Sequence, residues 1–261
     1  ARITKGHIVF DGKDLTSLSE SQLRKVRGAR ISMIFQDPMT SLNPVLTVGE
    51  QLQETILAHR KISKLRAKAL AVRLLKKVGI ADAAKRYNQY PFQFSGGMCQ
   101  RVMIAMALAL KSDVLIADEP TTALDVTIQA QILRLIKDLQ SQAGMSAVFI
   151  THNLALVADV ADEVLVLYGG LCMEQAPVHT LFKNPLHPYT QGLLNSLVSI
   201  KKKEDFLPAI AGNPPVPGTE CPGCPFAPRC PRVLKKCFKE RPPLFNSKGH
   251  KAACWLLEEK A

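Results

Sequence analysis

The strongest constraint on the fold is an apolar run that ends in two adjacent carboxylates, from Val114 to Glu119. The run has no alternation of polar residues, as expected of a strand that is buried on both faces of a parallel sheet. Ligands of open α/β sheets bind beyond the carboxyl ends of such strands. Asp118 and Glu119 repel each other there unless a cation compensates, and Mg²⁺ with nucleotide phosphates is such a cation. The alternative is a chance acidic pair at a helix N-terminus, where carboxylates are stabilised anyway.

Strand and helix patterns alternate around this run. Apolar runs and turn residues predict strands at 8–10, 31–35, 114–117, 147–150, 164–167 and 171–174, with the strand at 147–150 also buried. Apolar residues at three- and four-residue spacing predict helices at 19–27, 65–78, 97–110 and 128–140. This alternation favours a mainly parallel sheet with helices on both faces.

Three further groups of polar residues stand at places suited to a phosphate ligand. Ser95-Gly96-Gly97 opens a predicted helix, where backbone N–H groups can approach an anion, although a simple serine cap explains the same tripeptide. Gln36 and His152 each follow a predicted strand, so both are expected at the sheet edge that carries Asp118. Taken singly, either residue is more often structural.

Together these segments resemble an ordered set of known motifs. The segments FQDPMTSLNP (35–44), FSGGMCQR (94–101), LIADEPTTALD (115–125) and ITHN (150–153) resemble the Q-loop, the signature, the Walker B motif with D-loop, and the H-loop of ABC-type ATPases. The segment NPLHPYTQGLL (184–194) resembles the ATPase subunits of bacterial dipeptide and oligopeptide importers, with nickel importers as close relatives. The chain is thus identified as a member of that family.

The resemblance implies an α/β fold of the ABC-type ATPase class with a small additional domain at the C-terminal end. It implies a RecA-like ATPase core with a mainly parallel sheet at 1–38 and 111–200, with an inserted helical subdomain at 39–110 that carries the signature. Residues 201–217 are charged and then proline-rich, which predicts a linker. A small cysteine-rich tail domain at 201–261 includes that linker and ends the chain.

The resemblance also assigns roles to single residues. Glu119 is implied as the catalytic base, His152 as the switch residue, and Gln36 as the sensor of the γ-phosphate and a ligand of Mg²⁺ beside Asp118. The residues implied to contact ATP held by the opposite subunit are Ser95, Gly96, Gly97 and Asp125.

The family also uses a phosphate-cradling loop, G-x-x-x-x-G-K-[ST], and the printed sequence contains no such segment. Its nearest approach runs from Gly6 to Asp14, where the glycines stand one residue too far apart and an aspartate replaces the magnesium-binding hydroxyl. We interpret that stretch as an ordinary strand and turn. We therefore expect the chain as printed to be N-terminally incomplete and inactive alone.

Five of the seven cysteines lie between Cys221 and Cys254, and such crowding in a cytosolic ATPase indicates a metal or a cluster. The resemblance implies a [4Fe–4S] cluster, with Zn²⁺ and unligated thiols as alternatives. Cys221 is then spare, and Cys99 and Cys172 are expected to be core thiols. The ligands carried over by position are Cys224, Cys230, Cys237 and Cys254.

Charge and hydropathy limit the classes of partner that the chain is expected to have. Half of the formal net charge of +12 falls in residues 201–261, but no base-reading motif supports nucleic acid as a partner. No apolar run is long enough for a transmembrane helix. The resemblance implies cofactors ATP and Mg²⁺, a second ABC ATPase subunit, transmembrane permease subunits and, indirectly, an extracytoplasmic peptide-binding protein, at the cytoplasmic face of the inner membrane.

Two other functions remain open at this point. One is a non-hydrolysing regulatory cassette that supplies only its signature motif to a partner's ATP. The other is a soluble ABC protein of DNA repair or translation, which the HPYT segment (187–190) and the absence of long heptad repeats disfavour.

Overall fold

The computed structural model describes residues 3–121, 124–196, 209–216, 218 and 221–260. The chain divides into two compact units, Ala1–His152 and Asn153–Ala261, which we describe one at a time. In the described residues, no helix combines the length and the apolar character that crossing a bilayer requires.

The first unit is built on a parallel sheet with the strand order β3-β4-β5. The three strands are β3 (Ile31–Ile34), β4 (Val114–Asp118) and β5 (Ser146–Ile150), and they pair in continuous register. This confirms the predicted parallel sheet for the first unit. A separate hairpin of β1 (Val9–Phe10) and β2 (Lys13–Asp14) precedes the sheet in sequence.

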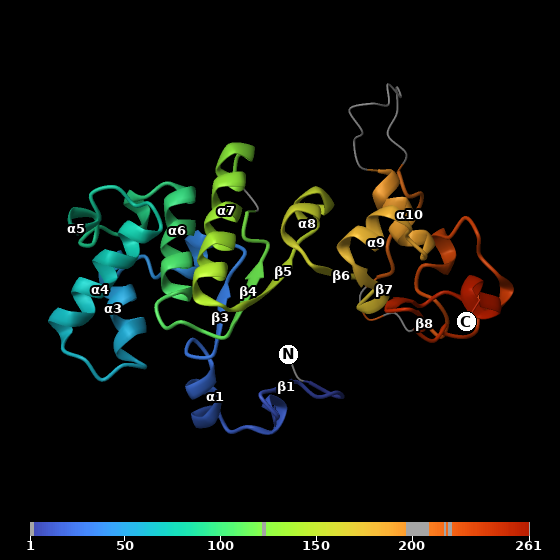
Figure 1. Ribbon diagram of the computed structural model, residues 1–261, viewed down its shortest axis with the longest axis horizontal. Helices are drawn as coiled ribbons and strands as arrows, with labels where there is room; N and C mark the ends of the chain where they lie inside the picture. Colours follow the sequence, from blue (N-terminus) through green and yellow to red (C-terminus); the bar gives the residue numbers. More distant parts are fainter. Residues whose placement is uncertain (1–2, 122–123, 197–208, 217, 219–220, 261) are drawn as a thin grey trace. The chain divides into compact units, whose positions relative to one another are not determined.

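Helices of the first unit follow the predicted periodicity closely. Helix α6 begins after its cap residue Ser95, and α1 begins after Ser19, whose side chain and that of Gln22 form a capping box. Helices α6 and α7 lie beside β3 and β4 (Figure 1). The helices are α1 (Glu20–Val26), α2 (Pro38–Ser41), α3 (Val48–Leu57), α4 (Lys64–Lys77), α5 (Ala83–Arg86), α6 (Gly96–Ala107) and α7 (Val126–Ala143), with short 3₁₀ turns at Leu15–Ser17 and Pro91–Gln93.

One hydrophobic core joins helices α3, α4, α5, α6 and α7 to one face of the sheet. Ile34, Leu115, Ile104 and Ile132 are fully or almost fully buried in it. The whole helical block between β3 and β4 packs into the same core, through residues such as Leu75.

The opposite face of this sheet is open among the described residues. Met33 and Val148 lie in register on that face, Ile150 follows two residues further along β5, and the three are 37%, 51% and 48% exposed. Within the first unit, the prediction that strands 114–117 and 147–150 are buried on both sides is therefore wrong, because the helices of that unit pack on one face only. The helices predicted for the second face of the sheet are not found among the described residues of that unit.

The second unit contains an antiparallel sheet with the order β6-β7-β9-β8. The strands predicted at 164–167 and 171–174 are confirmed, since β6 (Glu163–Tyr168) pairs with β7 (Leu171–Pro177) as a hairpin. Strand β9 (His250–Ala252) pairs with β7 on one side and with β8 (Phe245–Ser247) on the other. The cysteine-rich segment thus shares a sheet with residues that precede it by more than seventy positions.

Short helices complete the second unit. They are α8 (Leu154–Val160), α9 (Val178–Lys183), α10 (Pro188–Asn195) and 3₁₀ turns at Ala227–Arg229, Lys235–Phe238 and Trp255–Lys260. Tyr168, Tyr189 and Phe226 form an aromatic cluster that packs the hairpin and α10 against the cysteine-rich segment. The predicted linker at 201–217 lies largely outside the described residues.

Candidate functional site

Three adjacent parallel strands deliver the predicted polar residues to one edge of the first unit. Gln36 follows β3, Asp118 ends β4 with Glu119 next to it, and His152 follows β5. The backbone N–H of Glu119 donates to the carbonyl of Ile150 at 2.9 Å, which extends the pairing of β4 with β5 by one residue.

The carboxylate of Glu119 is the centre of this group. Gln36 Nε2 donates to Glu119 Oε2 at 2.8 Å, and His152 Nδ1 lies 3.0 Å from Glu119 Oε1. The Glu119 side chain is 22% exposed and that of His152 is 74% exposed. A bonded, half-buried carboxylate beside an open histidine is a suitable acceptor for a proton from water.

Glu119 has a left-handed backbone, with φ of +43°. Residues other than glycine rarely adopt this region, and they persist there only where the surroundings hold them. Here the backbone bond to Ile150 and the side-chain bond to Gln36 hold it. The turn ends β4 abruptly, so the Glu119 carboxylate lies at the strand end between Gln36 and His152.

The signature residues lie at the N-terminus of α6. Ser95 is exposed, and its hydroxyl accepts from the backbone N–H of Met98 at 3.4 Å. A Cβ on Gly96 would meet nothing within 4 Å, whereas a Cβ on Gly97 would lie 3.2 Å from Ile128 of α7. Gly96 therefore presents its backbone to open space, and Gly97 allows α6 to pack against α7.

Asp125 serves as the cap of α7. Its carboxylate accepts from the backbone N–H of Ile128 at 3.0 Å. The neighbouring Thr122 and Ala123 of the predicted D-loop segment lie outside the described residues.

The stretch from Gly6 to Asp14 forms the predicted strand and turn. Asp14 ends β2 and caps the following 3₁₀ turn through Thr16. Hydrogen bonds from Thr16 and His7 hold the pKa of Asp14 at about 2, so it is a carboxylate at neutral pH.

In the second unit, a single small cavity is lined by four of the cysteines, with His187 in its wall. Burial, together with the neighbouring cysteines, raises the pKa of Cys224 to about 11. Burial also raises the pKa of Cys230 and Cys254, and backbone N–H groups two residues on, at Phe226, Arg232 and Leu256, offset part of the rise at the three thiols. The four cysteines of this cavity are Cys224, Cys230, Cys237 and Cys254.

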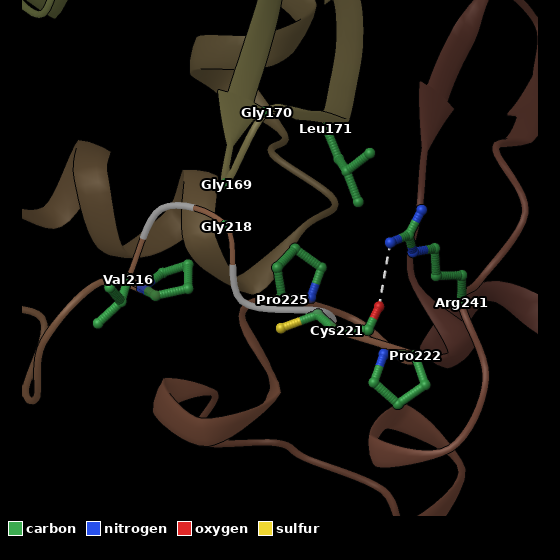
Figure 2. Close-up of a pocket in the computed structure, with 10 residues that line it drawn as sticks. Gly169, Gly170, Leu171, Val216, Gly218, Cys221, Pro222, Pro225 and Arg241 are labelled. Atoms are coloured by element: carbon green, nitrogen blue, oxygen red, sulfur yellow. Dashed lines mark hydrogen bonds between the residues drawn. The ribbon is translucent and has the colours of Figure 1, made fainter. Parts of the chain in front are cut away.

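The fifth cysteine of this region lies elsewhere. Cys221 lines a separate cavity of about 930 Å³ together with Gly170, Pro225 and Arg241 (Figure 2). Arg241 donates to the carbonyl oxygen of Cys221 at 3.0 Å. Among the described residues, no group of three or more histidine, cysteine or acidic side chains could hold a metal ion. The predicted cysteines therefore converge without forming a ligand sphere.

Comparison with known proteins identifies the family. The profile of the ABC transporter family matches residues 1–122, and that of the oligopeptide/dipeptide transporter C-terminal region matches residues 173–237. The dipeptide transport ATP-binding protein DppD of Bacillus subtilis is 50% identical over 100% of this chain and 78% of its own length. The chain belongs to the ABC transporter family. OppD of the same organism, an oligopeptide transport ATP-binding protein, is 52% identical over 98% of this chain and 72% of its own length.

Solved structures agree with this assignment over about two thirds of the chain. This ABC protein resembles the dimeric cassette MJ0796 bound to ADP and Pi, with a TM-score of 0.60 and 29% identity over 67% of this chain and 74% of that one. The clostridial protein cbiO1, part of a transporter complex, gives the same TM-score with 27% identity over 69% of each chain.

One buried polar network of the ABC protein was not predicted from the sequence. Glu174 of β7 is 0% exposed, and its carboxylate accepts from the backbone N–H groups of Leu186 at 2.7 Å and His187 at 2.9 Å. His250 Nε2 of β9 lies 2.7 Å from the same carboxylate. The only signal in the sequence is the HPYT segment itself, which begins at His187.

Proposed function

We propose that this chain is the ATP-hydrolysing subunit that energises uptake of dipeptides or oligopeptides through a membrane permease. The observation that carries the proposal is the Gln36–Glu119–His152 group at the ends of three parallel strands. The chain in which it occurs is about half identical to dipeptide and oligopeptide transport ATP-binding proteins along nearly its whole length.

In this proposal Glu119 accepts the proton of the water that attacks the γ-phosphate. Gln36 and His152 orient the carboxylate through its two oxygens, and His152, being exposed, is free to turn toward phosphate. Asp118 would hold Mg²⁺ through water, with the carbonyl end of the Gln36 amide as a second ligand. Mg²⁺ supplies positive charge that offsets the charge of the phosphates.

A second ABC subunit is part of the same proposal. Ser95, Gly96 and Gly97 offer a hydroxyl, open backbone and a helix N-terminus, which suit the phosphates of ATP bound by the opposite subunit. Asp125 caps α7 at the adjoining segment and would keep this surface in place. The solved dimer of a similar cassette supports this arrangement.

The remaining partners follow from the family. The subunit would work with transmembrane permease subunits on the cytoplasmic side of the membrane, as a peripheral protein, and receive substrate indirectly from an extracytoplasmic binding protein. We also infer that 39–110 acts as the helical subdomain within an ATPase core of 1–38 and 111–200, with 201–261 as an importer-specific extension.

A [4Fe–4S] cluster held by the four cysteines of the small cavity belongs to the proposal, with Zn²⁺ as the alternative. What supports it is that four thiols line one cavity, which is the number of ligands that such a cluster takes, although the described side chains are not arranged to hold a metal ion. When bound, the cluster supplies a one-electron redox group or a structural crosslink. Iron and sulfide analysis of anaerobically purified protein decides between the metals, and zinc without iron rejects the cluster.

Transport assays test the main function. The complete open reading frame, including any in-frame segment upstream of Ala1, is co-expressed with its genomic neighbours and reconstituted in vesicles. We expect ATP-dependent uptake of labelled dipeptide or oligopeptide. Uptake of nickel without peptide would overturn the substrate class. Binding of this chain to a partner's ATP, without hydrolysis by this chain, would favour the regulatory cassette.

A further inference from the structure

A dense positive charge lies on α4 and on the segments that flank it. Residues 60–86 contain ten lysines and arginines and one acidic residue, Asp82, so their net charge is +9 against +12 for the whole chain. Helix α4 lies at the end of the first unit away from the sheet (Figure 1). This charge is therefore far from the Gln36–Glu119–His152 group in the fold and has no part in its chemistry.

One face of α4 is turned away from the core. Four residues of the helix, among them Ala71 and Leu75, are buried in the core of the first unit. Because an α-helix has about 3.6 residues per turn, the opposite face is fixed by this burial, and we call it the basic face. The residues of the basic face, all exposed, are Leu65, Arg66, Ala69, Arg73, Lys76 and Lys77.

The charges of α4 do not all serve the helix itself. Lys64 and Arg66 lie in the first turn, where the helix dipole disfavours cations, and that turn contains no acidic residue. Arg73 and Lys77 stand four residues apart, a spacing at which like charges repel. In the part of the chain that the structure describes, no cation of the basic face forms an ion pair. Charges that cost a helix stability are expected where an anionic partner compensates for them.

An apolar side chain stands among these cations and indicates which anionic partner fits. Leu65 is 79% exposed, and the exposed Ala69 follows it one turn later on the same face. A bilayer surface offers anionic headgroups with an apolar phase directly beneath them, so it accommodates cations and an apolar side chain on one helix face. Nucleic acid offers phosphates without such a phase, and the basic face has no aromatic residue to stack on a base.

We propose that the basic face of α4 binds the anionic headgroups of a lipid bilayer, with Leu65 entering the headgroup region. This contact goes beyond the proposed function, because it joins the chain to lipid directly and needs neither ATP nor a permease. Each lysine or arginine close to an anionic bilayer strengthens binding by about fivefold. Four such cations and one leucine would hold the first unit at the membrane surface.

Co-sedimentation of the full-length protein with vesicles tests the proposal. The vesicles contain either phosphatidylglycerol mixed with phosphatidylcholine or phosphatidylcholine alone. The test variant carries glutamine in place of four cations of the basic face, namely Arg66, Arg73, Lys76 and Lys77. The control variant loses the same charge at four exposed lysines elsewhere, namely Lys13, Lys25, Lys235 and Lys239.

We expect the test variant to bind phosphatidylglycerol vesicles on the order of a hundredfold more weakly, and the control variant to bind within about threefold of the unsubstituted protein. Leu65→Gln should weaken the same binding by up to about tenfold, since it removes the apolar side chain and keeps a good helix former. The unfolding midpoints should not change, because every replaced side chain is exposed. If the test variant unfolds, Arg73→Gln alone decides, with an expected loss of about fivefold.

Equal losses in the test and control variants would overturn the role of the basic face. Binding to phosphatidylcholine alone as tight as to phosphatidylglycerol would overturn the anionic headgroup as the ligand. Binding to duplex DNA tighter than to phosphatidylglycerol vesicles would overturn lipid as the partner. ATP turnover does not enter the measurement, so a failure of the proposed function and a failure of this contact are told apart.

Discussion

Gln36 donates its side-chain amide to Oε2 of Glu119 at 2.8 Å, although 83 residues separate the two in the chain. The pairing is possible because β3 and β4 are parallel neighbours whose carboxyl ends lie at one edge. It leaves the second oxygen to His152. The Glu119 carboxylate therefore contacts side chains that follow two other strands, and substitutions at all three residues can test its chemistry.

The first test removes the charge of Glu119 and keeps its shape. Glu119→Gln should lower ATP turnover by about 10²- to 10⁴-fold, because a general base contributes about that much. Phosphate release by the assembled transporter measures the effect. Glu54→Gln, an exposed substitution on α3, is the control and should turn over normally. Turnover above a tenth of normal in Glu119→Gln would remove it as the base.

A second test asks whether Gln36 and His152 act through the same carboxylate. Gln36→Ala and His152→Ala should each lower turnover at least tenfold. The double variant should fall little further than the worse single one, because residues that act on one group are not additive. Turnover is measured at saturating ATP. Fully multiplicative losses would show that the two side chains act independently.

The signature glycines provide a matched pair. Gly96→Ala adds a methyl group to open space and should leave stability unchanged or raise it by up to about 1 kcal/mol, because alanine favours the helix. It should nevertheless weaken ATP-dependent dimerisation, since the methyl group covers backbone that faces the ligand. Gly97→Ala meets Ile128 and should lower stability as well.

Urea unfolding and sedimentation separate these two effects. The expected result is that Gly96→Ala changes sedimentation in ATP and does not lower the unfolding midpoint. A dimer of normal affinity in Gly96→Ala would mean that the open backbone at the start of α6 takes no part in ATP binding.

The buried network around Glu174 predicts an effect on stability. Glu174→Ala leaves two backbone N–H groups and His250 without their shared acceptor, and should cost about 3–5 kcal/mol of unfolding free energy. Chemical denaturation measures it. Glu163→Gln, at an exposed position on β6, is the control and should change stability by less than about 0.5 kcal/mol. A loss below about 1 kcal/mol in Glu174→Ala would contradict a structural role for the network.

The sequence was sufficient to predict that Gln36, Glu119 and His152 meet, because parallel strands end at a common edge. It was not sufficient to predict that Gln36 and His152 take one carboxylate oxygen each. That arrangement depends on the left-handed backbone of Glu119 and on side-chain rotamers, and neither has a signal in residue order.

Burial was predicted less well than strand position. Val148 and Ile150 belong to an apolar run, but their exposure depends on what covers the second face of the sheet. The burial of Glu174 could not be predicted either, since a polar residue within a strand usually faces solvent. Its partner His250 lies 76 residues further along, beyond the reach of any local pattern.

That interval of 76 residues has a consequence during synthesis. A ribosome adds about 5–20 residues per second, so the Glu174 carboxylate exists for roughly 4–15 s before His250 is made. Until then β7 lacks its β9 neighbour and the carboxylate stays hydrated. The second unit must therefore close late in translation, after the first unit has had time to form its core.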